Sequence, residues 1–475
     1  MAASEKPSLP AEPALDWNHY VSDFQKAAHQ AVDWAAEYLR DTRRYPVVPH
    51  VKPGDLVDAL PRSGPEQGES FAAIMRDFDS KIIPAVTHWN HPGFLAYFAC
   101  TGSTPAIIAE MLAAALNTNG LHWDTSPALV ELEQVALGWL REWMGVPADW
   151  FGIIYDTASL SSFHAICAAR EMVDPNARLN GATGSLVLYT SEQSHSSIEK
   201  GAIAAGIGQR NVRKVPTDAE FRMRPKALAA AIEQDLAAGK KPFCVVATVG
   251  TTSSTSVDPL AAIADIAENH GLWLHVDAAY AGAAALLPEC RDILAGIERA
   301  HSLVVNPHKW LFTNIDLSAF YTRRPDILRR AFSLVPEYLS PSEDPRAIHL
   351  MDYGVPLGHR FRALKLWFIL RYFGRERLQR ILRSHMDWAR RIADEIRADS
   401  RFEVIAPVTF SVVCFRYKGS DDDNRRIFEK VNASGKFFIS HTQLGGRYVL
   451  RLAIGNLGTT WEDVRGAWEM IQQSM

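Results

Sequence analysis

The sequence predicts an α/β protein built on a mostly parallel sheet, followed by a smaller α+β domain. Two observations carry this expectation. In the middle of the chain, short apolar runs alternate with stretches of helical periodicity, a pattern typical of a parallel sheet that helices cover on both faces. Towards the C-terminus, a long helical pattern is followed by short strands and helices, which indicates a separate α+β unit.

Short apolar runs mark the expected strands of the large sheet. The first four are separated by stretches that can hold a helix. The clearest of these stretches, VDPLAAIADIAENHG, offers Asp258 as N-cap, Pro259 in the first turn and Gly271 as terminator. In chain order, the apolar runs are FGIIYDTAS, GSLVLYTS, PFCVVATVGTT, LWLHVDAAY, SLVVNPHKW and SAFYTRR.

The N-terminal part is helical but has little core of its own. Residues 17–41 carry apolar side chains at helical spacing, and a Pro-rich stretch follows them. We therefore expect these helices to pack on something else, such as a second copy of the chain. The expected division is an N-terminal helical arm over residues 1–100, a large domain over 101–365 and a small C-terminal domain over 366–475.

Composition excludes several classes of protein. The chain has 475 residues, of which 47% are hydrophobic and 22% charged, so it can bury a large core. A net charge of −4 without a basic run predicts no nucleic-acid partner. No apolar run is long enough for a membrane span, and the start has no secretory signal. Five scattered cysteines without a CxxC pattern are typical of reduced thiols in a cytoplasmic protein.

Polar side chains follow the expected strands at the point where each strand ends. Because the carboxyl ends of parallel strands meet at one edge of an open α/β sheet, we expect these side chains to lie close together. They include small hydroxyl residues at a helix start, which suit a phosphate, and also an imidazole, an acid and a lysine. In chain order they are Asp156-Thr157-Ala158-Ser159, His195, Gly250-Thr251-Thr252, Asp277-Ala278-Ala279-Tyr280 and Asn306-Pro307-His308-Lys309.

Each of these residues also has a purely structural interpretation. The hydroxyls could cap a helix or form turns, His195 could be a loop histidine, and Asp277 could be a satisfied structural carboxylate. Their coincidence at one edge favours a ligand site, and the set suits a phosphorylated pyridine aldehyde better than a nicotinamide. No G-x-G-x-x-G follows a strand and no P-loop motif occurs. The 16 histidines form no H-E-x-x-H motif, and His/Cys pairs lack ligand spacing, so we expect no metal site.

Lys309 stands at the end of an apolar run, between His308 and Trp310. Burial favours the neutral amine, which is a nucleophile and can form a Schiff base with an aldehyde. The alternative is that the side chain reaches water along its own stem. These two possibilities stay open on the local sequence alone.

Five segments together resemble the pyridoxal-phosphate decarboxylases of the aromatic L-amino acid, or group II, family. They are NPHKW, HVDAAYAG, SEQSHSS, DTAS and VPLGHRFRALKLW, and the similarity extends from about residue 17 to 475. The resemblance implies a fold-type I architecture and a homodimer with active sites at the subunit interface. It also implies pyridoxal 5′-phosphate as cofactor and an intertwined N-terminal segment.

The resemblance also implies roles for individual residues. Lys309 would bind the cofactor covalently, Asp277 would pair with the pyridine nitrogen, and His195 and Ala279 would pack on the two ring faces. The phosphate would be held by Ala158, Ser159, Asn306 and His308, and Thr252 would lie beside the cofactor and His195.

Two residues bear on the reaction type. Tyr338 matches the family's loop tyrosine, the candidate proton donor, with an exposed loop aromatic as the alternative. Relatives that make aldehydes tend to replace this tyrosine with phenylalanine or the stacking histidine with asparagine. Because the chain keeps both Tyr338 and His195, the resemblance favours simple decarboxylation to an amine.

The expected substrate is an aromatic L-amino acid: tryptophan, tyrosine, phenylalanine or dihydroxyphenylalanine. Trp89, Tyr97 and Phe98 match a segment that lines the family's substrate pocket, although such residues are as often core. Gly358 matches a position where plant relatives with glycine favour indoles. The alternatives are an aromatic aldehyde synthase, a decarboxylase of a non-aromatic amino acid, and a relative that has lost activity.

Overall fold

The chain divides into two units, one ending at His88 and the other running from Trp89 to Met475. The computed structural model describes residues 16–182, 184–334, 344 and 346–475. Among the described residues, no helix combines the length and apolar character needed to cross a membrane.

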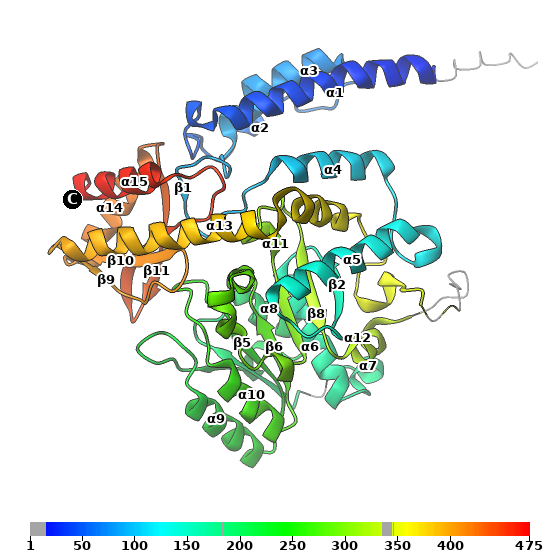
Figure 1. The fold of residues 1–475 in the computed structure, drawn as a ribbon, viewed down its shortest axis with the longest axis vertical. Coiled ribbons are helices and arrows are strands. Elements are labelled where there is room, and N and C mark those ends of the chain that lie inside the picture. The colour runs from blue at the N-terminus through cyan, green and yellow to red at the C-terminus, as the bar shows by residue number, and fades with distance from the viewer. Residues whose placement is uncertain (1–15, 183, 335–343, 345) are drawn as a thin grey trace, which may run out of the picture. The chain divides into compact units, whose positions relative to one another are not determined.

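The described α-helices of the first unit are α1 (Trp17–Arg40), α2 (Asp55–Ala59) and α3 (Phe71–Asp77) (Figure 1). Asp16 caps α1 by accepting hydrogen bonds from the backbone of Asn18 and His19 at 3.1 and 3.2 Å. None of the three helices buries a residue. The expected helix over 17–41 and its weak core are thus confirmed.

The second unit is built on a seven-stranded sheet with the order β2-β8-β7-β6-β5-β3-β4. The strands β7, β6, β5, β3 and β4 are parallel, whereas β8 runs antiparallel to both β7 and β2. The mostly parallel sheet is confirmed, and each expected apolar run holds a strand. The strand bounds are β2 (Phe151–Tyr155), β3 (Leu186–Ser191), β4 (Val212–Val215), β5 (Lys241–Thr248), β6 (Trp273–Asp277), β7 (Ser302–Val305) and β8 (Ser318–Thr322).

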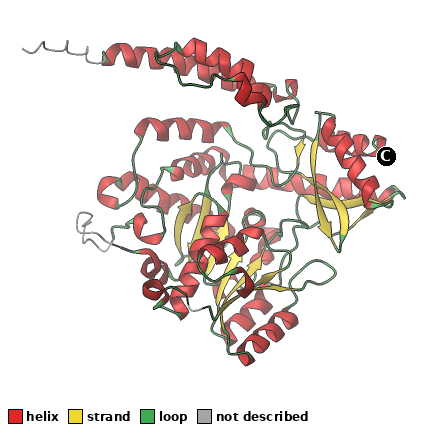
Figure 2. Ribbon diagram, turned by 180° about the vertical axis from the view of Figure 1, so that it is seen from behind, coloured by secondary structure: helices red, strands yellow, loops and turns green. Residues whose placement is uncertain are grey.

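Helices cover both faces of this sheet (Figure 2). Alternate residues of β5 belong to two different apolar clusters, Val245 and Ala247 to one, Cys244 and Val246 to the other. The period of two along a strand puts neighbours on opposite faces, so both faces are buried. The helices are α4 (Thr104–Leu116), α5 (Pro127–Met144), α6 (Ala158–Val173), α7 (Ala177–Asn180), α8 (Ser196–Ala204), α9 (Pro225–Ala237), α10 (Leu260–Asn269), α11 (Pro307–Trp310), α12 (Pro325–Phe332) and α13 (Arg362–Ala398).

One predicted helix cap was wrong. Helix α10 begins after Pro259, and Asp258 does not cap it. The Asp258 carboxylate is buried and accepts hydrogen bonds from the backbone of Met223 and Thr248, at 2.7 and 2.8 Å. A carboxylate can satisfy any nearby backbone donor, and here those donors come from other segments. Gly271 ends the helix as expected, with a φ of +64°.

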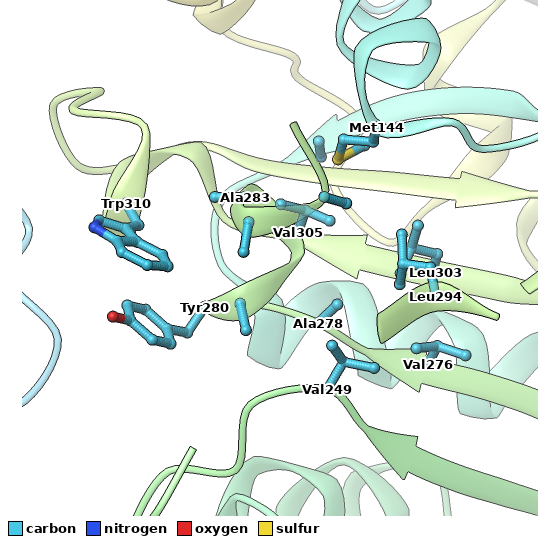
Figure 3. Close-up of a cluster of buried hydrophobic side chains, with 14 of the residues drawn as sticks. Met144, Val249, Val276, Ala278, Tyr280, Ala283, Leu294, Leu303, Val305 and Trp310 are labelled. Carbon is cyan, nitrogen blue, oxygen red and sulfur yellow. The ribbon is translucent and has the colours of Figure 1, made fainter. Parts of the chain in front are cut away.

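The larger apolar cluster reaches the carboxyl edge of the sheet (Figure 3). There Tyr280 and Trp310 stack with ring centroids 4.8 Å apart, and Phe98 stacks on Tyr280 at 3.9 Å. Trp310 is fully buried and donates to Nδ1 of His385 at 3.1 Å. The residue next to Lys309 is therefore fixed in the core, which holds the lysine at the sheet edge.

The C-terminal part forms a second sheet of five strands with the order β1-β11-β12-β10-β9. Strand β1 lies in the range expected for the N-terminal arm, yet it pairs in parallel with β11, and α13 crosses residue 365. The expected three-domain division stays a prediction. The bounds are β1 (Phe94–Leu95), β9 (Phe402–Val404), β10 (Val412–Tyr417), β11 (Phe438–Leu444) and β12 (Arg447–Ala453), with helices α14 (Asp421–Ala433) and α15 (Trp461–Gln473).

Candidate active site

A cavity of about 190 Å³ lies at the carboxyl edge of the large sheet. It collects residues that follow β2, β3, β5, β6 and β7, as the sequence predicts. A larger hollow of about 590 Å³ elsewhere has no lysine, histidine or cysteine among its described lining residues. Its lining residues are Phe98, Thr157, Ala158, Ser159, His195, Ser197, Thr248, Gly250, Thr252, Asp277, Ala279, Tyr280, Asn306, His308 and Lys309.

Lys309 borders this cavity from α11, the single turn that follows β7. Its Nζ lies 5.2 Å from the centre of the Phe98 ring, and within the described part of the chain it makes no hydrogen bond or ion pair. Burial lowers the pKa of Lys309, and the negative charge of Asp277 only partly offsets that effect. The amine thus borders the cavity with a lowered pKa, which favours its neutral, nucleophilic form.

Asp277 and His195 also line the cavity. Asp277 ends β6, and its Oδ1 accepts a hydrogen bond from the backbone of Ala279 at 3.1 Å. His195 caps α8, with Nδ1 accepting from the backbone of Ser197 at 3.1 Å. Burial lowers the pKa of His195, against an opposing effect of Asp277. A neutral ring that accepts at Nδ1 carries its proton on Nε2, so His195 offers a flat, uncharged aromatic face.

The start of α6 forms one end of the cavity. Thr157 caps this helix, with Oγ1 accepting from the backbone of Leu160 at 3.4 Å. Ala158 and Ser159 are its first two residues, where backbone N–H groups have no partner inside the helix. An N-terminus of a sixteen-residue helix in a cavity suits a phosphate group.

Asn306 and His308 lie close to each other at the cavity. His308 Nδ1 accepts from the backbone of Leu317 at 2.9 Å, and its Nε2 lies 3.3 Å from Nδ2 of Asn306. Burial lowers the pKa of His308 to about 4, so the ring is neutral at physiological pH. It can therefore orient a ligand by hydrogen bonding but does not supply a positive charge.

Two buried polar atoms at the cavity indicate that a polar ligand belongs there. Among the described residues, Thr248 Oγ1 and Asn306 Oδ1 have no hydrogen-bond partner, and both residues line the cavity. A buried polar atom without a partner costs about 1–3 kcal/mol. Together with an enclosed amine, a carboxylate and a helix start, these atoms fit a small phosphorylated pyridine aldehyde. Pyridoxal phosphate is thus compatible with the residues present.

Of the four residues expected to bind the substrate, only one lines this cavity among the described residues. Phe98 lines the cavity, whereas Trp89 and Tyr97 lie outside its lining with exposed fractions of 38% and 52%. Gly358 also lies outside the lining, beside the side chain of Asn119. Tyr338 lies outside the described residues. The substrate roles of these four residues stay predictions.

Some residues in and around the cavity were not identified from the sequence. Thr248 and Ser197 line the cavity but were not predicted to do so. Thr248 lies within an apolar run of the sequence, and Ser197 lies two residues after His195. Arg451, whose guanidinium carbon lies 4.9 Å from the centre of the Phe98 ring, donates to the carbonyls of Ser253 and Tyr97 at 2.8 and 3.0 Å. It therefore ties segments behind the Phe98 ring together, which sequence spacing alone does not reveal.

Comparison with known proteins places the chain in a family. Residues 53–418 match the pyridoxal-dependent decarboxylase conserved domain. A tyrosine decarboxylase of Petroselinum crispum is 41% identical over 473 residues, which is 95% of this chain and 92% of that protein. A phenylacetaldehyde synthase of Arabidopsis thaliana is 40% identical over 462 residues, which is 94% of this chain and 94% of that protein.

Solved structures agree over almost the whole chain. The crystal structure of Oryza sativa TDC with PLP and tryptamine is 37% identical, with a TM-score of 0.92 and coverage of 98% of this chain and 99% of that one. The Catharanthus roseus tryptophan decarboxylase in complex with L-tryptophan is 38% identical, with a TM-score of 0.91 and the same coverage. The fold-type I architecture and the pyridoxal cofactor are confirmed, and the chain belongs to the pyridoxal-dependent decarboxylase family.

Proposed function

We propose that this protein is a carboxy-lyase that converts an aromatic L-amino acid to its amine and CO₂ with pyridoxal phosphate. The substrates that we propose are tryptophan, tyrosine, phenylalanine and dihydroxyphenylalanine. The observation that carries the proposal is the placement of Lys309, Asp277 and His195 around one cavity. Relatives named for tyrosine and tryptophan decarboxylation, similar over nearly the full chain, support the aromatic substrate.

The residues that would hold the cofactor fall into three groups. Lys309 would bind its aldehyde carbon covalently. Asp277 would face the ring nitrogen, with His195 and Ala279 against the ring and Thr252 nearby. The N–H groups at the start of α6, with Ser159, Asn306 and His308, would hold the phosphate.

Pyridoxal phosphate, when bound, supplies an electron sink for the pair left at Cα when CO₂ departs. The chain's own groups support this chemistry by their charge states. The Asp277 carboxylate would keep a proton on the ring nitrogen, because an opposite charge nearby favours the protonated form. His195 stays neutral, since burial lowers its pKa, and so does not compete with the ring nitrogen for the Asp277 carboxylate. Tyr338 would deliver the proton to Cα.

The cavity lining favours an uncharged side chain on the substrate. Phe98 forms one wall, and Lys309 is the only lysine or arginine that lines the described cavity. An acidic substrate side chain would need a second cation to be buried there. This is why the aromatic assignment is preferred to a decarboxylase of an acidic amino acid.

An aldehyde synthase is the second candidate function. The similarity to a phenylacetaldehyde synthase supports it. The presence of both His195 and Tyr338 supports the amine product instead. Tyr338→Phe separates the two candidates, since we expect slower amine formation and diversion to aldehyde; unchanged amine turnover would remove Tyr338 from the mechanism.

We further propose a cytoplasmic homodimer whose active sites lie at the subunit interface. The exposed apolar side chains of α1, Trp17, Tyr20 and Phe24, support a partner for the N-terminal helices. All five cysteines are free thiols, which is consistent with a reducing compartment. Sedimentation analysis of the holoenzyme tests the dimer.

Product analysis tests the proposed function. Purified protein with added pyridoxal phosphate is supplied in air with tryptophan, tyrosine, phenylalanine, dihydroxyphenylalanine or glutamate. We expect equal amounts of amine and CO₂ from an aromatic substrate, without peroxide. Formation of aldehyde with ammonia and peroxide would instead support an aldehyde synthase. Turnover of glutamate alone would contradict the proposal of an aromatic substrate.

The preference for one aromatic substrate over another can be tested with a substitution at Gly358. A Cβ built at Gly358 meets only the Asn119 amide, at 3.7 Å, so Gly358→Ser fits without strain. We expect it to lower the preference for tryptophan over tyrosine by about tenfold, the effect of one small group in a pocket. An unchanged preference would remove Gly358 from substrate selection.

A further inference from the structure

Three potential metal ligands meet away from the cofactor cavity. One ligand atom each of His122, Asp124 and His349 lies within 4.8 Å of the other two. His122 Nδ1 is 3.4 Å from Asp124 Oδ2, and the two imidazole rings are 6.2 Å apart, at 69° to each other. None of these residues lines the cofactor cavity.

The two imidazoles of the cluster are largely buried, unlike the groups of an ordinary surface ion pair. His349 is only 7% exposed, and the His122 side chain is 14% exposed. Within the described chain, Nδ1 of His122 is buried and makes no hydrogen bond, although Asp124 Oδ2 lies 3.4 Å from it. Asp124, exposed by 35%, gives the cluster an opening to solvent. A buried imidazole nitrogen beside a carboxylate, with a second imidazole nearby, is an arrangement that a cation would complete.

The backbone around the cluster holds the two segments together. The N–H of Met351 donates to the carbonyl of Leu121 at 2.9 Å, one residue from His122 on one side and two from His349 on the other. Trp123 anchors the first segment by donating from its indole to Glu131 at 2.9 Å. The ligands thus come from segments that the fold keeps adjacent without a metal.

The donor set selects a class of metal. Two imidazole nitrogens and one carboxylate suit a divalent transition ion such as Zn²⁺, whereas Ca²⁺ and Mg²⁺ prefer oxygen ligands alone. Tetrahedral bonds of about 2.0–2.1 Å place ligand atoms about 3.4 Å apart. His122 Nδ1 and Asp124 Oδ2 already have this separation. The other pairs of ligand atoms lie within 4.8 Å, so they would need to approach by at most about 1.4 Å.

We propose that His122, Asp124 and His349 form a binding site for one divalent transition-metal ion, with water or a further group in the fourth position. The bound ion joins the segment before α5 to the segment around Leu350, and so stabilises both against local opening. The site is independent of the proposed decarboxylation. Spacing along the sequence conceals it, because His349 lies far from the other two ligands.

Zn²⁺ binding to metal-free holoenzyme tests this proposal. Isothermal titration with Zn²⁺ is compared for the wild type, Asp124→Asn, His349→Gln and the control His270→Gln. His270 also lies beside a carboxylate, Glu233 at 3.6 Å, but belongs to no three-ligand cluster in the described chain. Loss of an outer-shell partner alone weakens metal binding by about 10–100-fold, so loss of a ligand should cost more than about tenfold.

We expect one high-affinity ion per chain in the wild type and the control, and more than tenfold weaker binding in the two ligand variants. Zn²⁺ should also raise the Tm of the wild type and the control but not that of the two ligand variants. Equal binding by all four proteins, or none by the wild type, would overturn the proposal. If a variant unfolds, the wild type still decides: Co²⁺ should give the intense visible bands of a four-coordinate site. Only the weak bands of hydrated Co²⁺ would refute it.

Discussion

Among the described residues, Lys365 is buried and Lys309 is half-buried, and the surroundings of the two amines differ. Lys365 in α13 is fully buried, lies 3.1 Å from Glu110, and donates to the carbonyls of Asn314 and Asp316 at 3.2 and 3.1 Å. Lys309 borders the cofactor cavity and makes no such contact among the described residues. Burial lowers the pKa of both.

The contrast separates burial from reactivity. At Lys365, an ammonium has three donors and finds three acceptors, so the charged form is held in place and no electron pair is available. At Lys309, partial burial acts without those hydrogen bonds, and the amine borders the cavity. A lowered pKa alone therefore does not identify a nucleophilic lysine; unsatisfied donors beside a cavity do.

The largest expected effect is that of Lys309→Ala. We expect complete loss of the visible absorbance of bound cofactor and of amine formation, because no other free amine lines the described cavity. Absorbance spectra and product assays measure both. Lys365→Met is the control and should keep the visible band; a band in Lys309→Ala that borohydride reduces would refute the assignment.

Next in size is Asp277→Asn, which keeps the shape of the side chain and removes its charge. We expect kcat to fall by about 10²–10³-fold, the usual cost of removing one preorganised electrostatic group. Cofactor binding should persist, since Lys309 and the α6 start are unchanged. Steady-state kinetics with saturating pyridoxal phosphate measures the loss, and a kcat within a factor of two of wild type would show that Asp277 does not act on the cofactor.

The matched substitutions Lys365→Met and Lys309→Met compare stability in the cofactor-free protein. Lys365→Met leaves two buried carbonyls without their donor, which costs about 1–3 kcal/mol of unfolding free energy. Lys309→Met removes no hydrogen bond among the described residues and should cost less. Urea unfolding measures both, and the reverse order would contradict the structural role of Lys365.

The smallest expected effect is a shift in pH dependence. Because burial lowers the pKa of Lys309 below its ordinary value of 10.5, the neutral amine is populated at lower pH than in a free lysine. Pyridoxal phosphate is added to the cofactor-free protein at a series of pH values, and the rate of appearance of visible absorbance is measured. This rate should rise with pH and reach half its plateau below pH 10.5. Free N-acetyl-lysine in the same buffers is the control; a midpoint at or above its own would show an unperturbed amine.

The sheet edge could be predicted from the sequence, because each strand is an apolar run and its polar residues follow immediately. Lys309, Asp277 and His195 were found in this way, and the structure brings them to one cavity. Features that depend on distant partners could not be predicted. Strand β4 has only one fully buried residue and no apolar run, and β1 is two residues long and pairs with a strand near the C-terminus.

The charged network behind the site was missed for the same reason. Asp316 received no role from the sequence, yet its carboxylate accepts from Nε of Arg362 at 2.8 Å, and Arg362 also pairs with Asp156 at 2.7 Å. Asp156 precedes the cap of α6, so this network supports the expected phosphate end of the cavity. Nothing in local spacing connects these three residues.

Borohydride reduction of the holoenzyme, followed by peptide mass spectrometry, tests the central claim most directly. Reduction fixes the cofactor to the amine that holds it, and Lys309 and Lys365 fall in different peptides. We predict one phosphopyridoxyl group per chain, on Lys309, with Lys365 unmodified. A label on Lys365, or a reduced protein without any labelled lysine, would contradict the assignment of Lys309 as the residue that binds the cofactor.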